Sequence, residues 1–148
     1  MDWKPGSERQ KRLFCTQPYF FKVADQHKQI LRILKINDAL PKDKESLFWI
    51  NIQEIPKAPK EGTNALSIAL HTQVKMFYRP DALKEKRENA EQQVKMISDE
   101  GNTVLWNDPP YYFAIISVKQ NRTPIKVSED IKDKLSVFAP GEKVSLGK

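Results

Sequence analysis

Cys15, His27 and His71 are the side chains of this sequence whose types could perform covalent or acid–base chemistry. A thiol beside an imidazole can act as a nucleophile, and imidazoles and carboxylates grouped on one face can bind a metal ion. Neither histidine has another histidine or a carboxylate three or four residues further along the chain. We therefore predict no catalytic residues, no metal site, no enzyme activity and an inert thiol.

The five glycines lie too far apart to form a phosphate-binding loop or a nucleophile elbow. A single cysteine also excludes an intrachain disulfide and any Cys-rich zinc site. Nucleotide chemistry is therefore not expected, and we predict no cofactor.

The composition is that of a soluble globular protein, with 148 residues, 39% of them hydrophobic and 30% charged. Lysine and arginine exceed the acidic residues by 25 to 19, but these cations are scattered along the chain, which argues against nucleic-acid binding. No apolar run is long enough to cross a membrane. No signal peptide is visible either, because no apolar segment follows the basic residues near the N-terminus.

Two stretches alternate between apolar and polar residues as β-strands do. In residues 47–55 the side chains of Phe48, Ile50 and Ile52 share one face, and prolines then end the run, so a strand buried on at least one side is expected. In residues 65–78 a longer alternation places Leu66, Ile68 and Leu70 on one face together with Val74 and Met76. This run exceeds an ordinary strand in length, so one part of it could extend beyond the sheet that supports the other.

The remaining segments are shorter or ambiguous. Residues 28–36 suit a strand or an amphipathic helix. Residues 81–98 are crowded with charges and predict a solvated linker between domains. Beyond them, the apolar runs 103–106, 111–118 and 135–138 are separated by proline and asparagine turns, which is typical of a β-sandwich.

Four ordered blocks resemble the N-terminal domain of the periplasmic pilus chaperones of the chaperone–usher pathway. They are residues 40–51 (LPKDKESLFWIN), 54–56 (EIP), 66–70 (LSIAL) and 74–80 (VKMFYRP). The resemblance extends upstream to residues 31–33, where the family has a strand. Downstream it is softer, because the family usually reads Asn-Pro-Thr-Pro-Tyr-Tyr where this chain has NDPPYY at residues 107–112.

The resemblance implies an all-β fold of two immunoglobulin-like sandwiches. It divides the chain into an unmatched basic segment (1–12), an N-terminal domain (13–80), a charged linker (81–98) and a C-terminal domain (99–148). It also predicts that both sandwiches are incomplete, because the family's first strands and last strands find no match here. The family has no catalytic activity, and its compartment, the periplasm, is expected by resemblance.

The resemblance also implies a function and its residues. Leu66, Ile68 and Leu70 match the strand that the family donates to a pilus subunit before delivery to an outer-membrane usher. Lys75 matches the lysine that anchors the C-terminal carboxylate of the subunit, and Glu45 and Arg79 match two members of an interdomain ionic network. For an arbitrary alternating strand, the same three apolar residues would instead fill the protein's own core, and the two charges would be an ordinary surface pair.

Two alternatives stay open at this point. The chain could be a non-functional truncated relic of such a chaperone, or an unrelated β-sandwich that binds another ligand. The four blocks argue against the unrelated sandwich.

Overall fold

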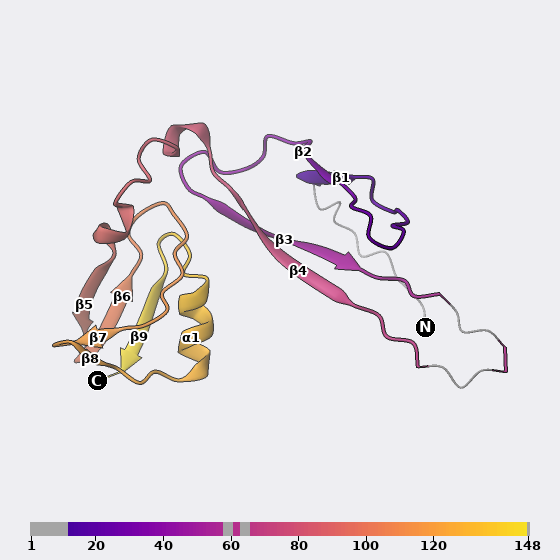
Figure 1. Cartoon of the computed structure of the whole chain (residues 1–148). Helices are drawn as coiled ribbons and strands as arrows, with labels where there is room; N and C mark the ends of the chain where they lie inside the picture. The colour runs from indigo at the N-terminus through magenta and orange to yellow at the C-terminus, as the bar shows by residue number, and fades with distance from the viewer. Residues whose placement is uncertain (1–11, 58–60, 63–65, 148) are drawn as a thin grey trace, which may run out of the picture. The chain divides into compact units, whose positions relative to one another are not determined.

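The structure is a computed structural model that describes residues 12–57, 61–62 and 66–147 (Figure 1). It divides into two compact units, Met1–Leu40 and Pro41–Lys148. The unmatched segment 1–12 lies almost entirely outside the described residues.

The first unit contains one antiparallel pair, β1 (Phe14–Gln17) and β2 (Arg32–Lys35). Cys15 of β1 lies opposite Leu34 of β2, and the Ile36 N–H donates to the Leu13 carbonyl at 2.9 Å. The ambiguous segment 28–36 therefore contains a strand and no helix, as the family resemblance predicted, although the strand begins at Arg32 rather than near Ile30.

The second unit begins with a two-stranded antiparallel hairpin, β3 (Ser46–Gln53) and β4 (His71–Tyr78). Ile50 lies opposite Val74 in its register, and Trp49 lies opposite Lys75. The strand predicted at residues 47–55 is confirmed with slightly different ends. Its predicted burial is only partial, because Phe48 and Ile50 are half-buried whereas Ile52 is 38% exposed.

The strand predicted at residues 65–78 is too long at its beginning. β4 starts at His71, and residues 66–70 are extended backbone outside any strand, while Ala65 lies outside the described residues. The reason is the length of the partner strand. β3 ends at Gln53, and the last cross-strand bond is donated by the Glu54 N–H to the Leu70 carbonyl at 2.9 Å.

Residues 81–147, here called the C-terminal body, contain a three-stranded antiparallel sheet in the order β5–β6–β9. The strands are β5 (Lys95–Asp99), β6 (Asn102–Trp106) and β9 (Lys143–Gly147). Glu100 and Gly101 both have positive φ in the two-residue turn between β5 and β6, which matches the twist of a tight hairpin.

The predicted linker 81–98 is wrong in its last part, where β5 begins. Its first part contains the 3-10 turns η1 (Asp81–Leu83) and η2 (Ala90–Gln93). β5 is one of the two edge strands of its sheet, and charged residues such as Lys95 are common on such edges because they discourage pairing with other chains. A charged composition therefore concealed the strand.

The apolar run 135–138 is not a strand, because α1 (Glu129–Ser136) includes its first two residues. Ile131 and Leu135 are spaced four residues apart and face the core, and Glu129 with Asp130 occupies the first turn, where acidic side chains favour a helix. The run 111–118 forms only an isolated bridge, between Phe113 and Phe138. A short hairpin of β7 (Lys119–Gln120) and β8 (Thr123–Pro124) follows it.

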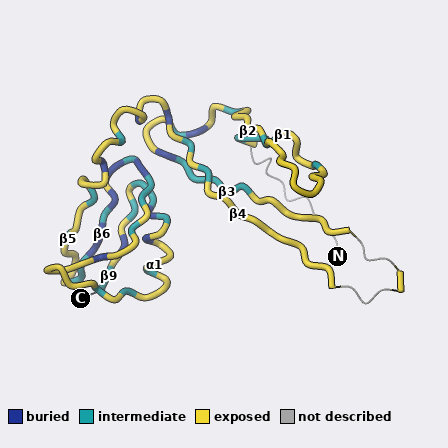
Figure 2. Tube along the Cα trace, in the orientation of Figure 1, coloured by how far each residue is buried: buried dark blue, intermediate teal, exposed yellow. Residues whose placement is uncertain are grey.

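Most of the buried apolar side chains lie in the C-terminal body, to which most of the dark blue segments of Figure 2 belong, whereas Leu40 is buried outside it. The main cluster of this body includes Phe138, which is fully buried, with Leu105, Val118, Leu135 and Val144. A second cluster consists of Leu83, Ala90 and Tyr111, and half-buried Phe113 packs against both clusters. The β3–β4 hairpin instead leaves large apolar side chains exposed, including Trp49, Val74 and Phe77 at 47% each.

Candidate functional site

Residues 66–70 form an extended segment that leads directly into β4. The side chains of Leu66, Ile68 and Leu70 are 87%, 67% and 65% exposed. Leu70 is held by Glu54, whose N–H donates to the Leu70 carbonyl and whose carboxylate accepts from the Leu70 N–H at 3.3 Å. Within the described residues, the backbone of residues 66–69 has no hydrogen-bond partner. The three predicted donor residues therefore lie outside this chain's own core.

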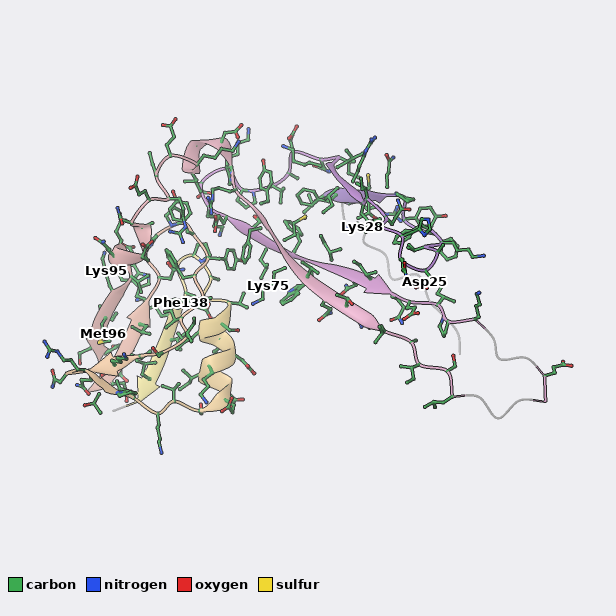
Figure 3. The ribbon with its side chains drawn as sticks, viewed as in Figure 1. Asp25, Lys28, Lys75, Lys95, Met96 and Phe138 are labelled. Carbon is green, nitrogen blue, oxygen red and sulfur yellow. The ribbon has the colours of Figure 1, made fainter. Side chains whose placement is uncertain are left out.

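Lys75 projects from β4 to the C-terminal end of α1 (Figure 3). Its Nζ lies 3.4 Å from the carbonyl oxygen of Ser136 and 5.6 Å from the centre of the Trp49 ring. The last carbonyls of a helix carry partial negative charge, so they stabilise an ammonium group there. No carboxylate among the described residues forms an ion pair with Lys75, so its charge is available to an anionic group.

Glu45 and Arg79 meet because the hairpin register places them at the same end. Glu45 directly precedes β3 and Arg79 directly follows β4, and the Arg79 Nε lies 2.6 Å from Glu45 Oε1. The Glu45 side chain is only 2% exposed, against 39% for Arg79. A buried carboxylate with a charged donor forms one of the stronger hydrogen bonds in proteins.

The second carboxylate oxygen of Glu45 contacts the C-terminal body. Glu45 Oε2 accepts from the Tyr112 N–H at 2.7 Å, and the Glu45 N–H donates to the Pro110 carbonyl at 2.9 Å. The Tyr112 N–H and the Pro110 carbonyl both belong to the loop at residues 108–112. Glu45 thus joins the base of the hairpin to that loop by two hydrogen bonds in addition to its ion pair.

Aromatic rings surround this contact. The Arg79 guanidinium lies 5.6 Å from the centre of the Tyr111 ring, and the Phe77 and Tyr112 rings are 5.4 Å apart. Burial raises the pKa of the Tyr112 hydroxyl above its ordinary value, and the Glu142 carboxylate raises it further. Sequence reasoning missed the loop as part of the site, although the NDPPYY stretch marks its place.

The structure joins Glu45 to Arg79 directly, whereas Lys75 contacts Ser136 and Trp49 instead. A separate apolar pocket of about 390 Å³ lies between residues 114–118 and α1. Across the described residues, no group of three His, Cys, Asp or Glu side chains could hold a metal ion, and no helix is long and apolar enough to cross a membrane.

Comparison with known proteins assigns the chain to a family. Residues 2–84 match the family described as pili and flagellar-assembly chaperone, PapD N-terminal domain. The chain is 49% identical over 134 residues to the chaperone protein FanE of Escherichia coli, covering 90% of this chain and 59% of FanE. It is 44% identical over 135 residues to the Escherichia coli chaperone FaeE, covering 90% of this chain and 52% of FaeE.

Solved structures of chaperones have the same fold. A Salmonella enterica structure of the SafA pilin in complex with the SafB chaperone matches with a TM-score of 0.71 and 24% identity, covering 91% of this chain and 62% of the matched one. The Pseudomonas aeruginosa CupB2 chaperone matches with a TM-score of 0.68 and 24% identity, covering 93% of this chain and 63% of CupB2.

The chain therefore belongs to the pilus-assembly chaperones of the chaperone–usher pathway. Its fold is all-β and immunoglobulin-like, which confirms the predicted class, with α1 as the one α-helix among the described residues. The chain spans about 59% of the length of FanE and 52% of FaeE.

Proposed function

We propose that this chain binds and caps pilus subunits by donating residues 66–70 as a β-strand. The observation that carries the proposal is the exposure of Leu66, Ile68 and Leu70 on an extended segment continuous with β4. Membership of the chaperone family and the SafA pilin bound in the SafB structure support the same function.

The physical basis is strand addition. A subunit whose sandwich lacks a strand has an apolar groove and a row of unpaired backbone groups, and an extended segment satisfies both. Side chains at residues 66, 68 and 70 alternate along one face, so they would enter the groove together. Five residues span about 16 Å, which is the length of an ordinary strand.

Lys75 would anchor the C-terminal carboxylate of the subunit. The Ser136 carbonyl and the Trp49 ring hold its ammonium group at the end of α1 without neutralising it. A carboxylate would replace a long 3.4 Å contact with an uncharged carbonyl by a hydrogen bond in which both donor and acceptor are charged. The anchor would also fix which residues of the subunit meet the donated strand.

Glu45 and Arg79 would act as a brace between the domains. Their ion pair joins the two ends of the hairpin, and the Tyr112 N–H connects the same carboxylate to the C-terminal body. A brace of this kind would keep Lys75 of β4 beside Ser136 of α1.

The function includes delivery of the capped subunit to an outer-membrane usher in the periplasm, without catalysis or a cofactor. These parts of the proposal rest on the family alone. The chain acts by binding, so its partners are pilus subunits and the usher rather than nucleic acid or the membrane interior.

The test compares two matched isoleucine variants. Ile68→Glu should abolish co-purification with pilus subunits, with the SafA pilin included among them, while the melting temperature stays almost unchanged. Ile116→Glu makes the same chemical change at a side chain that is 98% exposed in the C-terminal body, and it should leave capture intact. Unchanged capture by Ile68→Glu, or an equal loss in both variants, would contradict strand donation.

A further inference from the structure

Asn107 is a fully buried polar residue directly after β6, with 0% exposure. Its Nδ2 donates to three backbone carbonyls, those of Tyr111 at 2.8 Å, Ala139 at 2.9 Å and Phe138 at 3.0 Å. Within the part of the chain that the structure describes, its Oδ1 has no hydrogen-bond partner. Burying an amide whose oxygen is unpaired lowers the stability of the fold. The three donated hydrogen bonds are therefore the stabilising contribution of this side chain.

The Asn107 backbone is fixed by the turn that precedes β9. Its N–H donates to the Glu142 carbonyl at 2.9 Å, and its carbonyl accepts from the Gly141 N–H at 2.7 Å. Gly141 has a φ of +78° in the Pro140-Gly141 turn, a conformation that glycine adopts readily. The backbone of Asn107 is therefore fixed by two hydrogen bonds, and its side chain extends from this fixed point to the loop at residues 108–112.

Asn107 and Glu45 bind opposite ends of one peptide group. The carbonyl of Tyr111 accepts from Asn107, and the N–H of the same peptide, which belongs to Tyr112, donates to Glu45 Oε2. A peptide group is planar, so fixing the direction of its C=O also fixes the direction of its N–H. A hydrogen bond to the C=O also polarises the N–H and strengthens it as a donor.

We infer that Asn107 is the positioning residue of the Glu45–Arg79 brace and acts on it through the Tyr111–Tyr112 peptide. The buried amide sets the direction of the Tyr112 N–H, the N–H holds one oxygen of Glu45, and the other oxygen holds Arg79. This inference rests on the brace proposed above. Among the described residues, Asn107 forms no hydrogen bond with Glu45 or Arg79. It nevertheless controls how firmly the hairpin is attached to the C-terminal body.

The test uses the free chain, so it is independent of subunit capture. Asn107→Ala should accelerate hydrogen exchange of the Tyr112 amide by about tenfold or more relative to Val144→Ala, a variant of a buried β9 residue that lies opposite Leu105, compared at matched global stability. The loss of melting temperature caused by Glu45→Ala should fall to about half in the Asn107→Ala background. In the Val144→Ala background it should remain unchanged.

Equal Tyr112 exchange in the two backgrounds, together with additive effects of Asn107→Ala and Glu45→Ala, would overturn the inference. If Asn107→Ala does not fold, the same measurements on Asn107→Ser decide the question, since a hydroxyl supplies one donor in place of two. If the unmodified chain fails to capture subunits but Asn107→Ala and Glu45→Ala are coupled as expected, only the proposed function is contradicted. If the chain captures subunits but the two substitutions are not coupled, only the role of Asn107 is contradicted.

Discussion

The C-terminal body and the β3–β4 hairpin with its adjoining segment contain similar apolar side chains, which differ in how far they are exposed to solvent. In the body, Phe138 and Leu135 are 0% and 2% exposed, because a sheet, a helix and a loop pack against one another. Beside the hairpin, Leu66 and Ile68 are 87% and 67% exposed on a segment that pairs with no strand among the described residues. The difference teaches that apolar alternation alone does not identify core, because a side chain is buried only where a second layer exists to cover it.

The largest expected effect separates the two regions by stability. Phe138→Ala should lower the free energy of unfolding by about 3–5 kcal/mol, because it empties a fully buried site. Ile68→Ala should change it by less than about 0.5 kcal/mol, because the removed atoms are already in water. Urea denaturation of both variants measures the contrast, and a large loss for Ile68→Ala would place residue 68 in this protein's own core.

A smaller effect is expected where the regions join. Arg79→Ala should cost about 1–3 kcal/mol, because among the described residues it leaves the buried Glu45 carboxylate with one hydrogen-bond donor, the backbone N–H of Tyr112. Lys84→Ala removes a cation from a solvent-exposed ion pair and should leave the unfolding transition almost unchanged. Equal costs in thermal or urea unfolding would show that the Glu45–Arg79 contact is an ordinary surface pair.

Lys75 provides a prediction about binding rather than stability. Lys75→Ala should weaken subunit binding by about tenfold, since about 1.4 kcal/mol corresponds to one lost charge-assisted hydrogen bond. Its own stability should hardly change, because the contact with Ser136 is 3.4 Å long. Lys57→Ala, at an exposed lysine after β3, is the matched control in a binding titration, and equal weakening by both variants would rule out a specific anchor.

The smallest expected effect is a pH dependence at Tyr112. Burial raises the pKa of this hydroxyl in the folded state, so the unfolded state loses its proton first as the pH rises. The stabilisation from the neutral hydroxyl is complete below about pH 10 and is lost as the pH rises through the folded pKa. As the pH rises above about 10, the Tyr112→Phe variant should therefore lose less stability than the wild type.

Tyr19→Phe is the control for this titration, because it removes a tyrosine that is 91% exposed. Melting curves from pH 9 to 11 should leave its profile parallel to that of the wild type. Parallel profiles for Tyr112→Phe as well would show that burial of the Tyr112 hydroxyl contributes nothing to stability.

Much of the hairpin could be predicted from sequence, and less of the C-terminal body. Alternation located β3 at both ends to within a few residues and β4 at its end, and the motif resemblance placed Glu45 and Arg79 in one ionic network. The beginning of β4 at His71 could not be read, because it depends on where β3 ends. α1 was missed because it has only eight residues, and Leu135 looked like part of a short apolar strand.

The role of the Tyr112 N–H was also invisible to sequence reasoning. A backbone group has no signature in the residue type that carries it, and its partner Glu45 lies 67 residues away. The proline-rich loop around it marked a turn, which gave the place but not the contact.

Hydrogen–deuterium exchange at residues 66–70 tests the central claim most directly. In the free chain these amides should exchange rapidly, because residues 66–69 have no backbone partner among the described residues. In a complex with a pilus subunit they should be protected by about tenfold or more, while Leu105 and Val144 of the core keep their original rates. Rapid exchange at residues 66–70 in a saturated complex would contradict strand donation.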